Sequence, residues 1–285
     1  MRRFKIDEET AKTRLDVFCA NKLPNLSRAF VQRLIDEGKI LVNKAPEKPG
    51  YKLREGDKIT IDFEEQELDK IPDIEMPILY EDENVLVVNK PVGVISHARG
   101  RYWNEPSVAS FIRQKTGLEG ERAGIVHRLD RVTSGVMICS KNSETLSYLQ
   151  KQFSVRKVRK TYVAIVKGTP EPKAAIIDMP IERNPKKPQA FRVGKGGRPS
   201  ITHYEVTKSN DEYSMLVLKP ETGRTHQLRV HLAKLGFPIV GDILYEGPEA
   251  DRLYLHAEQL EITLPGGKRI TLTAKLPPEF AKMVA

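Results

Sequence analysis

From residue 78 onward the sequence consists mainly of short segments that are rich in apolar and β-branched residues, a composition typical of β-strands. These segments span residues 78–82, 85–90, 135–140, 161–168, 202–208, 213–219, 259–264 and 269–274, and the few helical candidates span 107–116, 142–153 and 225–235. Many of the segments are separated by tight turns such as Pro-Gly-Gly at 265–267, which favour antiparallel pairing. We therefore predict an α+β fold for residues 78–285, with a mixed, mostly antiparallel sheet and flanking helices.

Residues 1–70 are predicted to form a smaller α/β module. The stretch LSRAFVQRLIDEGK at 26–39 has one apolar face, with Ser27 as the expected N-cap and Gly38 at the expected end of the helix. Arg28 and Arg33 lie on the polar sides of that helix. The strand ILVN and a second strand with alternating apolar residues up to Phe63 follow, so the module combines helices with a hairpin.

An acidic, proline-containing stretch follows the module. Residues 64–83 contain nine acidic residues against one lysine, together with Pro72 and Pro77. This composition is typical of a solvated linker. We place a domain boundary near residue 70 and extend the linker to about residue 77.

The positive charge of the chain is concentrated in one region. Residues 151–200 hold 13 lysines and arginines against three acids, whereas the whole chain has 47 against 38 and a formal net charge of +9. A balanced chain with one basic zone is typical of a protein that binds a polyanion, and we favour nucleic acid over a membrane because the zone lacks a long amphipathic helix.

Two cysteines, Cys19 and Cys139, each lie within an apolar pattern and are expected to be reduced core thiols, which indicates a cytoplasmic protein. The N-terminus has no pattern of a signal peptide, and no segment is apolar enough to span a membrane.

The stretch GIVHRLDRVTSG at 124–135 places several ionisable groups where the apolar pattern suggests a buried strand ending in a turn. A hydrolase could use Ser134 with His127 and Asp130, but the serine lacks the G-x-S-x-G context of an exposed nucleophile. The favoured interpretation is a single carboxylate, Asp130, presented at a strand end beside a glycine-flanked turn. Alternatively, Asp130 only accepts hydrogen bonds from the amides of the turn and from Thr133.

The stretch KPETGRTHQLRVHLAKLGFPIVGD at 219–242 is predicted to contain a short helix. Arg224 and Arg229 fall near its start, where the helix dipole disfavours cations, so each is expected to find an anion such as Asp130 or an RNA phosphate. His226 and His231 are five residues apart, about 140° around a helix, which argues against a shared metal ion. No metal site is predicted.

Tyr162 lies in the strand RKTYVAIVKG at 159–168, within the basic zone. A tyrosine in a strand either belongs to the core or presents its ring to a nucleic-acid base, and its position alone does not decide between the two. The chain has no glycine loop with the spacing needed to cradle phosphates, since GKGG at 194–197 does not match it, and no cofactor is expected.

Together, these motifs resemble the RluA-type pseudouridine synthases, from ILYEDENVLVVNKPVGVISH through GIVHRLDRVTSG, RKTYVAIVKG and GRTHQLRVHLAKLGFPIVGD to LYLHAEQLEITLP. The resemblance implies the pseudouridine synthase fold. It also implies that Asp130 is the essential carboxylate, that Tyr162 stacks on the base and that Arg229 pairs with the aspartate. Arg128 would occupy the place vacated by the extruded nucleotide. The order and residues of the N-terminal module resemble the S-four type of RNA-binding module, although the module could instead be a stabilising subdomain without a ligand.

The remaining residues expected to contact substrate are His127, Arg224, His226, Leu228, Arg28 and Arg33. The function implied by the resemblance is the isomerisation of specific uridines to pseudouridine in structured RNA, without cofactor. We expect a monomer, although nothing in the sequence reveals the oligomeric state. Relatives that carry the module point to large-subunit ribosomal RNA. The alternatives are a transfer-RNA pseudouridine synthase and a ribosome-assembly factor that binds RNA without catalysis.

Overall fold

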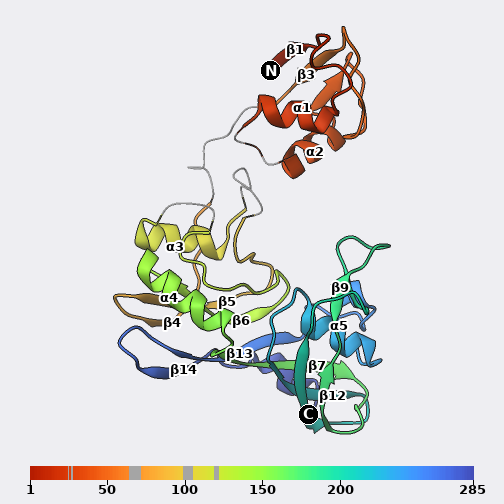
Figure 1. The fold of residues 1–285 in the computed structure, drawn as a ribbon. Helices are drawn as coiled ribbons and strands as arrows, with labels where there is room; N and C mark the ends of the chain where they lie inside the picture. The colour runs from red at the N-terminus through yellow and green to blue at the C-terminus, as the bar shows by residue number, and fades with distance from the viewer. Residues whose placement is uncertain (25, 27, 64–71, 99–104, 119–121) are drawn as a thin grey trace. The chain divides into compact units, whose positions relative to one another are not determined.

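The computed structural model describes residues 1–285 except 25, 27, 64–71, 99–104 and 119–121 (Figure 1). The described chain divides into two compact units, Met1–Pro72 with Ala98–Glu105, and Asp73–His97 with Pro106–Ala285. The expected cap Ser27 and residues 64–71 of the expected acidic linker lie outside the described residues. Within the described residues, no helix combines the length and the apolar character needed to cross a membrane.

The first unit contains two helices and a small antiparallel sheet. Its elements are β1 (Arg2–Lys5), α1 (Leu15–Lys22), α2 (Arg28–Asp36), β2 (Ile40–Val42) and β3 (Lys58–Ile61), and the strand order is β1-β3-β2. The predicted helix forms as α2 and buries Val31, Leu34 and Ile35 in a core that also contains Cys19. Strand β1 was not predicted, because three of its four residues are basic and only Phe4 is apolar.

Within the described residues, the second unit is built on a nine-stranded sheet whose main path is β4-β5-β6-β13-β7-β12-β11-β8, with β14 paired to β13. Its strands are β4 (Ile78–Glu81), β5 (Val85–Lys90), β6 (Ser134–Ser140), β7 (Arg159–Lys167), β8 (Ala174–Asp178), β11 (Ile201–Ser209), β12 (Tyr213–Pro220), β13 (Leu255–Thr263) and β14 (Arg269–Thr273). Among the described residues, the strand pairings of this sheet are antiparallel except that of β6 with β13, which is parallel. The predicted mixed, mostly antiparallel sheet is therefore confirmed.

Three strands of the second unit were not predicted. Strand β8 is an alanine-rich edge strand, and β9 (Ile181–Arg183) and β10 (Phe191–Val193) form a separate two-stranded hairpin of three residues each. Strands this short carry too little alternation to be detected in a sequence. The segment from Ile181 to Arg198, called here the basic arm, also carries six arginines and lysines and one glutamate.

The helices of the second unit are α3 (Val108–Thr116), α4 (Ser143–Ser154), α5 (Gln227–Lys234) and α6 (Pro278–Lys282), with a 3₁₀ helix η2 (Ile243–Tyr245). Helices α3, α4 and α5 occupy the predicted positions. A capping box between Ser107 and Ser110 starts α3, and the Asn142 side chain accepts a hydrogen bond from the amide of Thr145 at the start of α4.

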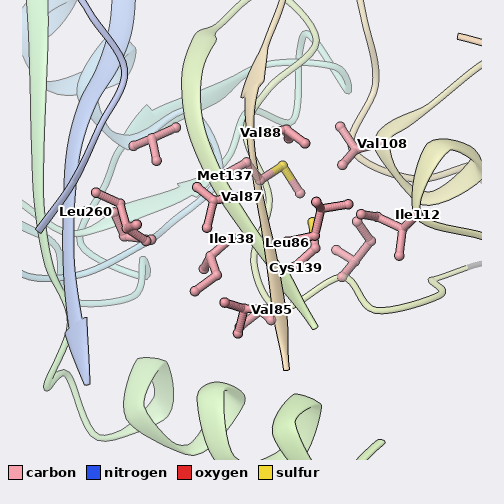
Figure 2. Packing of buried hydrophobic residues seen from close by; sticks show 14 of the residues in the cluster. Val85, Leu86, Val87, Val88, Val108, Ile112, Met137, Ile138, Cys139 and Leu260 are labelled. Atoms are coloured by element: carbon pink, nitrogen blue, oxygen red, sulfur yellow. The ribbon is translucent and has the colours of Figure 1, made fainter. Parts of the chain in front are cut away.

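Strands β5 and β6 are apolar on both faces, as Figure 2 shows. Leu86 pairs with Cys139 and Val88 with Met137, and these side chains lie on the side of α3. Val87 and Ile138 point the other way, towards β13. This packing gives the segment that leads into β6 a rigid support.

The parallel contact between β6 and β13 depends on a glycine. Gly135 has φ +122° and pairs with Ala257, and a Cβ atom at position 135 would overlap the backbone of Ala257. The contact joins the apolar cluster around β5 and β6 to strands β13 and β7.

Candidate active site

Asp130 lies in an irregular segment that leads into β6, and not after a strand as the sequence suggested. Ile125 makes only an isolated bridge, to Cys139, so the apolar residues of GIVHRLDRVTSG pack into the core without extending a strand. The prediction that Asp130 follows a strand was wrong, because Asp130 precedes the strand, which begins at Ser134.

The backbone is anchored on both sides of Asp130. The amide of Leu129 donates to Ser96 Oγ at 3.0 Å, and Ser96 Oγ donates to the Leu129 carbonyl at 2.8 Å. After Asp130, the carbonyl of Arg131 accepts from Lys90 Nζ, which also donates to the carbonyls of Pro91 and Val94. Burial lowers the pKa of Lys90 to about 7. The sequence analysis identified neither Lys90 nor Ser96.

The carboxylate of Asp130 faces two basic side chains. Its Oδ2 lies 3.4 Å from Arg229 Nη1 and 3.8 Å from His226 Nε2, and the side chain is 18% exposed. The amide of Thr133 donates to the main-chain carbonyl of Asp130 at 3.1 Å. The turn therefore uses the main chain of Asp130, while the carboxylate is directed at Arg229 and His226.

Arg229 bridges two carboxylates. It lies on α5 as expected, but its shorter hydrogen bonds go to Asp242, from Nε at 2.7 Å and from Nη2 at 2.8 Å. Although burial opposes its charge, the hydrogen bonds to Asp242 raise the pKa of Arg229. Asp242 is itself buried. The guanidinium has one remaining nitrogen, Nη1, for Asp130, and Asp242 is a site residue that the sequence analysis missed.

Tyr162 connects the two cores of the second unit and also faces the site. It pairs with Leu218 of β12 and Ala257 of β13, and it packs against both apolar clusters while remaining partly exposed. Burial raises the pKa of Tyr162, so its hydroxyl stays protonated at neutral pH. Its ring is therefore both supported by the core and available at the surface of a cavity.

His127 is held as a neutral ring. It stacks on Phe153 with ring centroids 4.7 Å apart, and its Nε2 accepts a hydrogen bond from the amide of Ile138 at 3.1 Å. Burial lowers the pKa of His127 to about 3. His127 can therefore offer its ring to a ligand but not a positive charge.

A cavity of about 310 Å³ brings the predicted residues of the second unit together. Its lining includes Asp130, Tyr162, Arg229, His127, Arg128, Arg224, His226 and Leu228. Lys160 also lines it, and burial lowers the pKa of this lysine to about 8. The cavity lies within the size range of small-molecule sites, roughly 300–1,000 Å³, and combines one carboxylate with several cations.

Arg28 and Arg33 lie in the first unit. Arg28 forms an ion pair with the buried Asp16 at 3.0 Å and remains half exposed, and the guanidinium of Arg33 lies 3.3 Å from Glu37. The hydrogen bonds from Arg14 and the other partners of Asp16 hold the pKa of that carboxyl well below its usual range. These contacts fix both arginines on α2.

The alternative sites suggested by the sequence do not assemble. Ser134 is buried, and its Oγ lies 2.8 Å from His256 Nδ1 and accepts from Arg252 at 2.6 Å, so its histidine partner is not His127. His231 is buried between Thr202 and the carbonyl of Met179. Among the described residues, no group of three or more His, Cys, Asp or Glu side chains is arranged to hold a metal ion.

Comparisons with known proteins point to one family. A family model described as RNA pseudouridylate synthase matches residues 84–234, and an S4 domain model matches residues 13–59. The chain is 40% identical to an RNA pseudouridine synthase of Aquifex aeolicus over 251 residues, which cover 85% of this chain and 79% of the relative. It is 36% identical to ribosomal large subunit pseudouridine synthase D of Borreliella burgdorferi over 300 residues, which cover 98% and 90%.

A solved structure agrees with these sequence comparisons. Human RNA pseudouridylate synthase domain containing 1 is 28% identical, with a TM-score of 0.61, and the match covers 78% of this chain and 89% of that one. Asp130, Tyr162 and Arg229 fall inside the segment that the first family model matches, whereas Asp242 lies beyond it.

Proposed function

The chain belongs to the RNA pseudouridylate synthase family, and from this premise we propose that it converts specific uridines of large-subunit ribosomal RNA to pseudouridine with Asp130 as the catalytic carboxylate. The observation that carries the proposal is the position of the Asp130 carboxylate, 3.4 Å from Arg229 and on the surface of the cavity. The cavity could receive a nucleoside that has left its RNA stack.

The reaction breaks the bond between uracil N1 and ribose C1′, rotates the base and forms a bond between C5 and C1′. The proton on C5 is released and N1 gains one, so no electron acceptor or energy source is required. An ionised carboxylate serves the reaction either by attacking or stabilising the electron-poor ribose carbon or by removing a ribose proton. In both cases Arg229 orients the Asp130 carboxylate.

Other residues of the cavity have roles that follow from their positions. Tyr162 keeps the detached uracil in place by stacking, because its ring is fixed by both cores. Arg128 is exposed beside Asp130 and fills the place that the extruded uridine leaves in the RNA. Arg224, which lines the cavity, binds phosphate, and His127, His226 and Leu228 form part of the cavity wall.

RNA affinity comes from surfaces outside the cavity. Extruding a uridine costs a few kcal/mol, and phosphate contacts by the basic arm and by Arg28 and Arg33 of the N-terminal module offset this cost. We assign the module to residues 1–70, with a linker to about residue 77 and a catalytic domain over 78–285. The buried thiols Cys19 and Cys139 suit a reducing cytoplasm, and we expect a monomer.

The preference for ribosomal RNA rests on the names of relatives such as the Borreliella burgdorferi protein, together with the match to the S4 domain. A transfer-RNA substrate is the enzymatic alternative, and an RNA-binding assembly factor without catalysis is the alternative from another class.

Tritium release separates these functions. In vitro transcripts of large-subunit ribosomal RNA and of transfer RNAs, tritiated at C5 of uridine, are incubated with the wild type, Asp130→Asn and the exposed surface control Asp211→Asn. We expect release from the ribosomal transcript by the wild type and by Asp211→Asn, and none by Asp130→Asn, with RNA affinity retained in all three. Release only from transfer RNA would overturn the substrate, and tight binding without release by the wild type would favour the assembly factor. Chemical mapping of pseudouridine in cells that lack the protein then identifies the position.

A further inference from the structure

Tyr245 contacts three parts of the active site without lining the cavity. It ends η2, three residues after Asp242, and its hydroxyl oxygen lies 2.8 Å from His226 Nδ1. The amide of Phe191, in the basic arm, donates to the same hydroxyl at 3.0 Å. The guanidinium carbon of Arg229 lies 5.0 Å from the centre of the tyrosine ring, within the range of a cation–π contact.

The contact between the Tyr245 hydroxyl and Nδ1 of His226 bears on which nitrogen of the imidazole carries the hydrogen. Burial raises the pKa of Tyr245 to about 12, so the hydroxyl is protonated. Its oxygen accepts from Phe191, and donation of the hydroxyl proton to His226 Nδ1, 2.8 Å away, gives that proton an acceptor. A neutral imidazole that accepts at Nδ1 carries its hydrogen on Nε2. That atom lies 3.8 Å from Asp130 Oδ2.

His226 needs this support because its backbone is unfavourable. It precedes α5 with φ 57°, a left-handed conformation that is unfavourable for a residue other than glycine. The rings of Phe191 and Tyr245 hold the imidazole edge-on, with centroids 5.6 and 5.7 Å away.

Charged groups surround the imidazole. Burial lowers the pKa of His226, and Arg229 and Arg128 act in the same direction, while Asp130 and Asp242 oppose them. The ring is therefore neutral at neutral pH, and its tautomer decides whether Asp130 faces a hydrogen-bond donor or a lone pair.

We propose that Tyr245 is a positioning residue of the pseudouridine synthase reaction, which holds His226 with its hydrogen on Nε2 so that this group and Arg229 together orient the Asp130 carboxylate. The proposal rests on the proposed role of Asp130. In this role Tyr245 does not contact the substrate. Its hydroxyl contacts both the amide of Phe191, in the basic arm, and the imidazole of His226 in the active site.

The test compares Tyr245→Phe with a matched control, Tyr204→Phe, in single-turnover tritium release from the RNA that the wild type modifies. Tyr204 is also a buried tyrosine, and its hydroxyl donates to the carbonyl of Pro172 at 2.8 Å, but it does not line the cavity. For Tyr245→Phe we expect a maximum rate about tenfold lower, equivalent to about 1.4 kcal/mol, with RNA affinity unchanged. The control should match the wild type.

A pH profile distinguishes positioning from structural damage. The Tyr245 hydroxyl stabilises neutral His226, so its removal should raise the histidine pKa and move the acid limb of the rate profile to higher pH. In a His226→Asn background, where the amide tolerates the left-handed backbone and does not titrate, Tyr245→Phe should cause no shift. The proposal is overturned by a wild-type profile in Tyr245→Phe, by a uniform loss at every pH, or by a shift that persists without His226. Failure of the proposed function is seen separately, as absence of release by the wild type or release by Asp130→Asn.

Discussion

Replacing Asp242 with asparagine should destabilise the catalytic domain, whereas the same change at Asp130 should abolish catalysis with little effect on stability. Both carboxylates face Arg229, but in different ways. Asp242 is 1% exposed and accepts two hydrogen bonds of 2.7 and 2.8 Å, while Asp130 is 18% exposed and its closest arginine nitrogen is 3.4 Å away. Without the charge of Asp242, the buried Arg229 guanidinium keeps only the Asp130 carboxylate as a nearby anion, at 3.4 Å instead of 2.7 Å.

The size of the effect follows from these contacts. Breaking a buried ion pair by removing one partner costs about 3–5 kcal/mol. Asparagine keeps one acceptor oxygen and Asp130 keeps its charge, so we expect the lower end, about 3 kcal/mol. In a domain of about 200 residues each kcal/mol lowers the Tm by about 2–4 °C, and the Asp242 variant should therefore melt about 6–12 °C below the wild type. For Asp130→Asn we expect about 1 kcal/mol or less, because Arg229 retains its bidentate partner.

Calorimetry of both variants and the wild type measures these shifts, since it resolves the transition of the catalytic domain from that of the N-terminal module. Tritium release at a temperature below all the transitions then compares their activities. The reasoning is refuted if Asp242→Asn melts with the wild type, or if Asp130→Asn is the less stable of the two.

Three further outcomes are expected. Tyr162→Phe should retain more of the single-turnover rate than Tyr162→Ala, because stacking requires the ring; equal losses would contradict a stacking role. Burial lowers the pKa of Lys90 from 10.5 to about 7, so between pH 7 and 10.5 the unfolded chain binds more protons than the folded chain. The free energy of unfolding of the wild type should therefore increase as the pH rises through this range. Urea unfolding of Lys90→Met should show a smaller increase. Gly135→Ala should destabilise the catalytic domain by about 4 kcal/mol or more, because a side chain would collide with Ala257, and a wild-type Tm would argue against that collision.

The strands of the catalytic domain were predictable where they are long and buried. Strands β5 and β6 are runs of apolar residues with both faces covered, so their composition alone identifies them. Strands β8, β9 and β10 were missed because they are short or lie at an edge, where neither burial nor alternation shapes the sequence. The hairpin of β9 and β10 makes tertiary contacts such as the hydrogen bond of the Phe191 amide with Tyr245.

The candidate site was predictable where its residues lie in compact motifs. The resemblance pointed to Asp130, Tyr162 and Arg229, and the structure places all three on one cavity. Asp242 and Tyr245 were missed because their partners, Arg229 and His226, lie 13 and 19 residues earlier in the chain, which no helix or turn spacing indicates. The one signal for Asp242 was an acid that ends the apolar run FPIVGD, where a charge must find a buried partner.

The supports behind the site could not be inferred in the same way. In the sequence, Lys90 is not distinguishable from other lysines that end a strand. Its buried side chain donates to the carbonyls of Pro91 and Val94, which are close in the chain, and to that of Arg131, which is not. Such contacts depend on the path of the backbone and leave no pattern in the sequence around the lysine.

The pairing of β6 with β13 also limits when the catalytic domain can fold during synthesis of the chain. Ser134 and His256, which face each other across this contact, are 122 residues apart in the chain, and Arg229 and Asp130 are 99 apart. On the ribosome, β6 therefore waits with one edge unpaired until β13 has emerged, and contacts of such long range form slowly. A nascent chain shorter than about 255 residues has no completed sheet, so the catalytic domain can assemble only after the whole N-terminal module has been synthesised.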